Sequence, residues 1–240
     1  MPTVIYGHGI CVEYDHWRGL IDECRALVRL GFRVIRPEAP WHGRRVVPGM
    51  FGGERIIGTF PTGILDTLTG AVREWAVLAR WARETSTGPL VLAGSSLGAL
   101  TAQLVADRAR AWPAELRPDA MLLVTHTGDL AEVVGGGALA SLFASPAELA
   151  RSGWSKAHLA PYLAMLNPGA ELALAPDRVV SVLGRRDVIL PFAGGESLVT
   201  RWGIPVQNTF IWDRGHFSVP MTLVRDDAPL QRLQQIVAGI

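Results

Sequence analysis

The stretch Gly94-Ser95-Ser96-Leu97-Gly98 decides the fold of this chain. An apolar run, PLVLA at 89–93, precedes it, and an alanine-rich stretch at 99–110 with helical character follows it. The order strand, G-x-S-x-G, helix is typical of a nucleophile elbow, a strained turn that holds its central serine above the end of a sheet. Strand and helix approach closely in such a turn, so the residues two before and two after the serine must be small. Only Ser96 has glycine at both positions, which predicts Ser96 rather than Ser95 as a nucleophile.

Outward from this turn, strand-like and helix-like segments alternate. The expected strands are 3–6, 32–35, 89–93, 120–124, 178–183 and 207–212, and the expected helices are 15–30, 63–84, 99–110, 193–202 and a last one from 221 or 227 to 240. The strands are continuous apolar runs, which favours a mainly parallel sheet buried on both faces. The predicted fold class is therefore α/β, with a mainly parallel six-stranded sheet and helices on both faces.

Two segments interrupt the alternation. Residues 41–62 form a glycine-rich loop too long for a simple connector, and long loops of this kind are usually functional. After 129 comes a glycine break at 135–137, then short amphipathic helical pieces at 139–143, 145–152 and 155–166. We expect one domain over 1–240, with a core at 1–128 and 177–240 and a small helical lid insertion at 129–176.

Composition excludes several classes of partner. The 240 residues are 49% hydrophobic and carry a formal net charge of +1 without a long basic or acidic run, so neither nucleic acid nor an anionic membrane is expected as a partner. No apolar run reaches the roughly 18 residues of a membrane helix. Cys11 and Cys24 lack metal-ligand spacing, which predicts free thiols and no metal site. With no signal-peptide pattern at the start, we expect a cytoplasmic protein.

Four polar features follow predicted strands: Gly7-His8-Gly9, Ser96, Asp187 and His216. The carboxyl ends of parallel strands share one edge of the sheet, so these features converge there. A serine nucleophile needs an adjacent base, and that base needs an orienting carboxylate. The order serine, aspartate, histidine is that of elbow-type hydrolases. We therefore predict Ser96 as nucleophile, His216 as general base and then acid, and Asp187 as the group that orients the imidazole.

Negative charge that develops on an acyl oxygen needs hydrogen-bond donors. The backbone N–H of Leu97, directly after the nucleophile, is one expected donor. The N–H of Ile10, in the glycine-rich turn after the first strand, is the other. Each donor is worth about 3–4 kcal/mol in the transition state.

Other residues compete for these roles. Asp129 is a rival acid, and Asp187 could instead be a solvated turn aspartate. His8 and His126 are rival bases, although His8 is better suited to hold the oxyanion loop and His126 to line the pocket. Surface or lid positions are expected for His16, His42 and His158. The apolar candidates for the pocket lining are Trp41, Met50, Phe51, Leu130, Phe143 and Phe217.

Over nearly its whole length the chain resembles proteins of the α/β-hydrolase fold. The resemblance rests on 7–10 (GHGI), 94–98, 184–187 (GRRD) with Pro191, and 215–216 (GH). It implies a Ser-Asp-His triad and no cofactor. Two strands that usually precede the first one are missing, which leaves an uncovered edge strand and favours a homodimer or a covering loop.

A narrower resemblance rests on Pro40-Trp41-His42-Gly43-Arg44-Arg45 and the loop after it. It is similar to the group typified by alpha/beta-hydrolase domain-containing protein 18, whose members carry a P-aromatic-aromatic-G-x-R segment there. His42 replaces the second aromatic residue. That group implies lipid-like or acyl esters, and Arg44 and Arg45 are either solvated or anchors for an anionic substrate group.

The expected function is that of a serine hydrolase that cleaves a carboxylic ester of a small-molecule substrate through an acyl-enzyme. The fold also supports other acyl transfer, amide and thioester hydrolysis and C–C bond hydrolysis. A non-catalytic ligand-binding protein of the same fold is the alternative from a different class.

Overall fold

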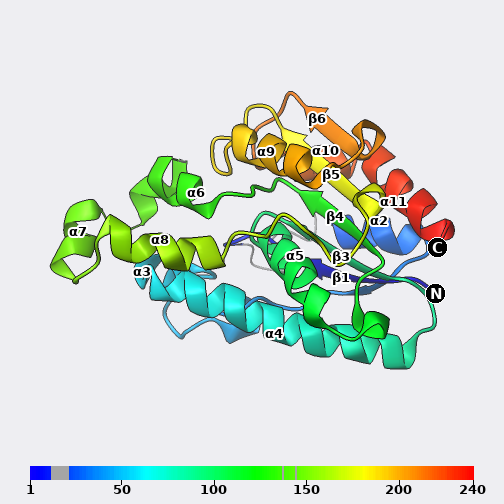
Figure 1. Ribbon diagram of the computed structural model, residues 1–240, viewed down its shortest axis with the longest axis horizontal. Helices are drawn as coiled ribbons and strands as arrows, with labels where there is room; N and C mark the ends of the chain where they lie inside the picture. The colour runs from blue at the N-terminus through cyan, green and yellow to red at the C-terminus, as the bar shows by residue number, and fades with distance from the viewer. Residues whose placement is uncertain (12–21, 137, 144) are drawn as a thin grey trace.

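The computed structural model describes residues 1–11, 22–136, 138–143 and 145–240. A six-stranded sheet with the order β2-β1-β3-β4-β5-β6 forms its centre, and every described strand pair is parallel (Figure 1). The strands are β1 (Thr3–Gly7), β2 (Arg33–Ile35), β3 (Leu90–Ser95), β4 (Ala120–Val124), β5 (Val179–Gly184) and β6 (Thr209–Trp212). The predicted fold class is confirmed.

Helices cover both faces of the sheet because its strands bury alternate side chains on each. Val4 and Tyr6 of β1 pack on one face, against α2 (Glu23–Arg29), α10 (Ser218–Leu223) and α11 (Ala228–Ala238). Ile5 packs on the other face, with α4 (Thr62–Thr85), α5 (Leu97–Arg108) and α9 (Phe192–Trp202). This two-sided burial explains why the strands read as continuous apolar runs.

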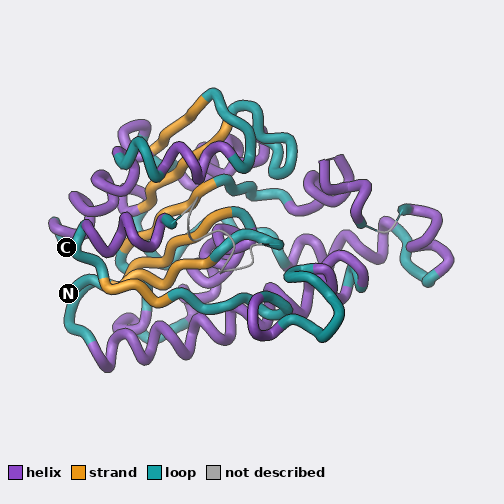
Figure 2. The backbone as a smooth tube through the Cα atoms, turned by 180° about the vertical axis from the view of Figure 1, so that it is seen from behind, coloured by secondary structure: helices purple, strands orange, loops and turns teal. Residues whose placement is uncertain are grey.

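The remaining helices gather at the end of the molecule away from both termini (Figures 1 and 2). They are α3 (Glu54–Gly58), α6 (Leu130–Gly136), α7 (Pro146–Arg151) and α8 (Lys156–Met165). A third apolar cluster joins them to the core, with Phe60 against Phe143 at a ring-centroid distance of 5.0 Å. Short 3-10 turns complete the described secondary structure: Gly43–Arg45, Ala109–Ala111, Ala114–Leu116, Ala138–Leu142, Pro176–Arg178 and Val206–Asn208.

Several predicted boundaries need correction. Of the helix predicted at 15–30, residues 15–21 lie outside the described residues, and α2 begins at Glu23, after Asp22 caps it through the N–H of Arg25. The predicted loop 41–62 contains α3. The glycine break predicted at 135–137 is wrong for Gly135 and Gly136, because α6 continues through both residues and ends at Gly136. Leu130 and Val133 of α6 are buried, so packing outweighs the low helix propensity of glycine. The single helix predicted at the end of the chain is two helices, α10 and α11.

Among the described residues, no helix combines the length and apolar character that crossing a membrane requires.

Candidate active site

Ser96 lies in a strained turn between β3 and α5. Its φ of 53° and ψ of −116° fall in a region that residues with a side chain rarely adopt. Its N–H donates to the carbonyl of Val124 at 3.0 Å, which ties the turn to β4. A Cβ on Gly98 would lie 2.0 Å from the carbonyl oxygen of Gly7, and one on Gly94 would lie 2.4 Å from the backbone of Gly98. Only glycine fits at these two positions, as the sequence pattern predicts.

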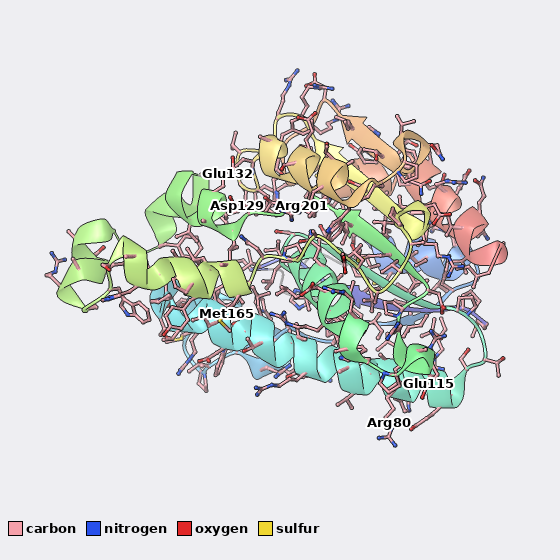
Figure 3. All side chains as sticks on the ribbon, in the orientation of Figure 1. Arg80, Glu115, Asp129, Glu132, Met165 and Arg201 are labelled. Atoms are coloured by element: carbon pink, nitrogen blue, oxygen red, sulfur yellow. The ribbon has the colours of Figure 1, made fainter. Side chains whose placement is uncertain are left out.

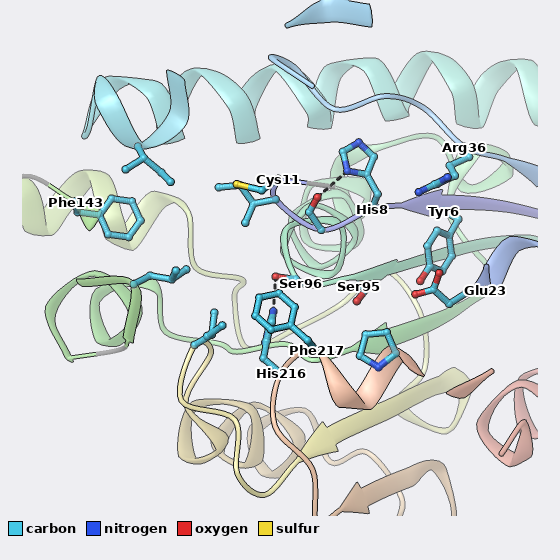
Figure 4. A pocket seen from close by; sticks show the side chains of 16 residues that line it. Tyr6, His8, Cys11, Glu23, Arg36, Ser95, Ser96, Phe143, His216 and Phe217 are labelled. Carbon is cyan, nitrogen blue, oxygen red and sulfur yellow. Dashed lines mark hydrogen bonds between the residues drawn. The ribbon is translucent and has the colours of Figure 1, made fainter. Parts of the chain in front are cut away.

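A chain of hydrogen bonds joins Ser96, His216 and Asp187. The Oγ of Ser96 lies 3.0 Å from Nε2 of His216 (Figure 4), and Nδ1 of His216 lies 2.7 Å from Oδ2 of Asp187. The second oxygen of Asp187 accepts the N–H groups of Ile189 and Leu190, both at 2.9 Å. All three catalytic candidates are only 6–7% exposed. Since Nδ1–H donates to the carboxylate, Nε2 is left to accept the Ser96 hydroxyl proton.

Asp129, the rival acid, is occupied elsewhere. Its Oδ1 accepts the N–H of Ala131 at 2.9 Å, in the first turn of α6. It lies with Glu132 and Arg201 at a second hollow of about 230 Å³ between α6 and α9 (Figure 3). The structure therefore brings Asp187, and not Asp129, to His216.

His8 joins two loops beside the site. Its Nδ1–H donates to the carbonyl of Gly9 at 2.8 Å, and its Nε2 accepts the N–H of Ala39 at 3.0 Å. Burial lowers the pKa of His8 to about 4, so the ring is neutral at pH 7. This arrangement agrees with the structural role predicted for His8.

His42 is buried rather than at the surface, which corrects its predicted position. Its Nδ1–H donates to the carbonyl of Pro40, and its Nε2 accepts the N–H of Cys11. His42 thus connects the loop after β2 to the loop after β1. His158 is exposed on α8, and His16 lies outside the described residues.

The predicted oxyanion donors flank the nucleophile. Leu97 is the first residue of α5, and Ile10 lies in the turn after β1 and lines the cavity beside Ser96. Neither N–H has a hydrogen-bond acceptor within the described part of the chain. Both are therefore available to a ligand, as an oxyanion hole requires.

A cavity of about 410 Å³ opens on Ser96 and His216. Its described lining has an apolar set, Ile10, Ile57, Leu139, Phe143, Ile189 and Phe217, and a polar set that includes Tyr6, Glu23 and Arg36. Ile57 comes from α3, and Leu139 and Phe143 come from the segment predicted as a lid. Phe217 is 65% exposed and packs edge-on against the His216 ring at 5.3 Å. Met50, Phe51 and Leu130 are outside this lining.

Two of the predicted substrate-binding residues do not reach the cavity. The His126 ring is buried, with Nε2 2.7 Å from the Ser181 hydroxyl, and burial lowers its pKa to about 3. The Trp41 ring packs in the third apolar cluster, with the Arg55 guanidinium over it at 4.5 Å. Sequence distance from a strand end does not show which way a ring points, so of Trp41, His126 and Phe217 only Phe217 lines the cavity.

Of the two loop arginines considered as anion anchors, Arg45 is used within the protein. Arg45 forms two hydrogen bonds to the carboxylate of Glu74, at 2.7 and 2.8 Å, and one to the carbonyl of Glu38. Neither Arg44 nor Arg45 lines the cavity. Within the described residues, no group of three or more His, Cys, Asp or Glu side chains is arranged to hold a metal ion.

Sheet order, elbow and strand-end side chains together define the α/β-hydrolase fold, and comparisons with solved structures agree. TT1662 from Thermus thermophilus superposes with a TM-score of 0.67 at 22% identity, over 98% of this chain and 89% of that one. A Xanthomonas campestris protein assigned to the alpha/beta hydrolase superfamily has a TM-score of 0.56 at 18% identity, over 99% of both chains. A cold-adapted esterase from an Arctic intertidal metagenomic library has a TM-score of 0.58 at 16% identity, over 98% and 82%. The chain therefore has the α/β-hydrolase fold.

No protein-family model matches the sequence, and no curated protein sequence matches it. The structural matches do not bear on the narrower resemblance of residues 40–45, which stays a prediction.

Proposed function

We propose that this chain is a serine hydrolase that cleaves a carboxylic ester through an acyl-enzyme. The observation that carries the proposal is the hydrogen-bond chain from Ser96 through His216 to Asp187, with distances of 3.0 and 2.7 Å. It supplies a nucleophile, a base and an orienting carboxylate in the arrangement that acyl transfer needs. Ser96 is also aimed at a cavity large enough for a small substrate.

In this mechanism the Ser96 oxygen attacks the carbonyl carbon of the ester while Nε2 of His216 takes the hydroxyl proton. Asp187 stabilises the resulting imidazolium, and the N–H groups of Leu97 and Ile10 donate to the oxyanion. His216 then gives its proton to the leaving alcohol. Water attacks the acyl-enzyme by the same steps and releases the acid.

Two further observations support an ester with an apolar part as the substrate. The apolar set of lining residues gives the cavity an apolar surface, where a hydrocarbon chain gains by leaving water. Structural neighbours described as esterases include the Arctic enzyme and one from Pyrobaculum calidifontis, whose TM-score is 0.55 at 18% identity over 100% of this chain and 74% of that one. We also propose that 129–176 acts as a lid, because Leu139 and Phe143 close the cavity from that segment.

Labelling with a fluorophosphonate probe tests the proposal. The wild-type protein should gain one phosphonyl group by mass spectrometry, and peptide mapping should place it on Ser96. Ser96→Ala should not be labelled and should not hydrolyse p-nitrophenyl butyrate. Ser95→Ala is the matched control, since it removes the neighbouring hydroxyl from the same cavity and should still be labelled. Absence of labelling in the folded wild-type protein would favour a non-catalytic ligand-binding protein.

A further inference from the structure

One end of the cavity carries polar groups that the catalytic steps do not use. Tyr6 from β1, Glu23 from α2 and Arg36, directly after β2, line this end. In Figure 4 they lie on the opposite side of Ser96 from Phe143. The cavity therefore has an apolar end and a polar end, with the nucleophile between them.

Glu23 is an unusual lining residue because it is only 7% exposed and yet faces a cavity. Its carboxylate lies beside the Tyr6 hydroxyl. Burial raises the pKa of Glu23, while the neighbouring Tyr6 hydroxyl and the Arg36 guanidinium lower it. A buried acceptor in this position gains from any donor that a ligand brings.

Tyr6 supplies a second group beside this carboxylate. Its hydroxyl is buried and reaches no described partner at hydrogen-bond geometry, although it lies with its oxygen toward Glu23 (Figure 4). Burial raises the pKa of Tyr6 well above its usual value, and the Glu23 carboxylate raises it further. The phenol therefore stays protonated and can donate a hydrogen bond.

The charges at this end oppose each other. The field of Arg36 lowers the pKa of both Tyr6 and Glu23, so the guanidinium acts on the same space as the carboxylate. A ligand with a net charge would be attracted by one and repelled by the other. A neutral hydroxyl group can donate to Glu23 and accept from Tyr6 at the same time.

We propose that Tyr6 and Glu23 form a subsite for a hydroxyl group of the substrate, so that the preferred esters carry a hydroxyl away from the scissile carboxyl group. This inference rests on the proposed function and adds the substrate class to it. The hydroxyl belongs to either the acyl or the alcohol part of the ester, and the experiment separates the two.

Pairs of esters that differ only by hydroxyl against methyl test the subsite. The acyl pair is p-nitrophenyl 6-hydroxyhexanoate against p-nitrophenyl heptanoate, and the alcohol pair is 2-hydroxyethyl butyrate against propyl butyrate. A purely apolar cavity favours the methyl member of each pair. We expect the hydroxyl member of one pair to have a kcat/KM at least about tenfold higher, because a site built to bind a hydroxyl discriminates against the analogue that lacks it. Preference for the methyl member in both pairs would overturn the inference.

Variants connect the preference to these two residues. Tyr6→Phe removes only the hydroxyl and Glu23→Gln only the charge, and each should reduce the preference to about threefold or less. The control is Tyr162→Phe, which removes a phenol from the exposed side of α8, outside the cavity lining, and should leave the preference unchanged. Unchanged preference in both folded cavity variants would contradict the assignment.

Binding to the Ser96→Ala protein separates this inference from the proposed function. Calorimetric titration with the same ester pairs needs no catalysis, and the hydroxyl member of one pair should bind about tenfold more tightly. If the wild-type protein hydrolyses no ester but this binding preference is present, the proposed function fails and the subsite stands. If esters are hydrolysed but the methyl members bind equally or more tightly, the subsite fails alone.

Discussion

The sheet edge that carries Ser96, Asp187 and His216 is built differently from the segments 41–62 and 129–176 that cover it. At the edge, backbone hydrogen bonds hold the turns: the N–H of Arg185 donates to Trp212 at 2.8 Å and that of Arg186 to Arg214 at 3.0 Å, which ties the turn after β5 to the turn after β6. The covering segments pack on the core through the third apolar cluster, in which Phe60 and Phe143 lie with Leu97 and Leu100 of α5. The topology of the sheet thus positions the catalytic groups, while packing shapes the cavity.

The largest expected effect compares one aspartate from each region. Asp187→Asn should lower kcat for p-nitrophenyl butyrate about 10⁴-fold, because an amide that donates to His216 favours the wrong imidazole tautomer. Asp129→Asn, at the start of the covering segment 129–176, should stay within about twofold, since asparagine caps a helix as well as aspartate does. Steady-state kinetics on both variants measures the difference. A large loss in Asp129→Asn with normal activity in Asp187→Asn would reverse the assignment of the acid.

The same difference explains what the sequence could predict. Ser96, Asp187 and His216 follow strands, and in a parallel sheet the end of each strand lies at the same edge. To predict that these three side chains come together, it is therefore enough to identify the strands correctly. Each strand is marked by an apolar run. The need for glycine at 94 and 98 is also predictable, because strand and helix approach too closely there for any residue with a Cβ.

The residues that line the cavity could not be predicted from the sequence in this way. His126 follows β4 just as His216 follows β6, yet its ring turns to Ser181 inside the sheet. Glu23 belongs to a helix with an ordinary amphipathic pattern. No sequence signal there distinguishes a glutamate that faces a cavity from one that faces solvent. Ile57 belongs to a short helix inside a glycine-rich stretch, where tertiary packing rather than local propensity produces the helix.

The second comparison uses one glycine from each region and measures stability. Gly98→Ala should lower the free energy of unfolding by about 3–5 kcal/mol, because the new Cβ would lie 2.0 Å from the backbone oxygen of Gly7. Gly58→Ala, at the end of α3 in the covering segment 41–62, meets no atom within 4 Å and should stabilise the protein by about 0.5 kcal/mol. Chemical denaturation of both variants gives the two values. Equal, small effects would show that the edge tolerates backbone movement and is not the rigid region.

The smallest expected effect concerns the shape of the cavity rather than its chemistry. Ile57→Ala removes an apolar wall contributed by 41–62, so longer acyl chains should fit better. We expect the ratio of kcat/KM for p-nitrophenyl octanoate to that for the butyrate to rise about tenfold, the scale of one hydrophobic contact in a pocket. Ile211→Ala is the matched control, since Ile211 lies on β6, is 38% exposed and is outside the cavity lining. An unchanged ratio in Ile57→Ala, with normal labelling of Ser96, would mean that 41–62 covers the edge without selecting the acyl group.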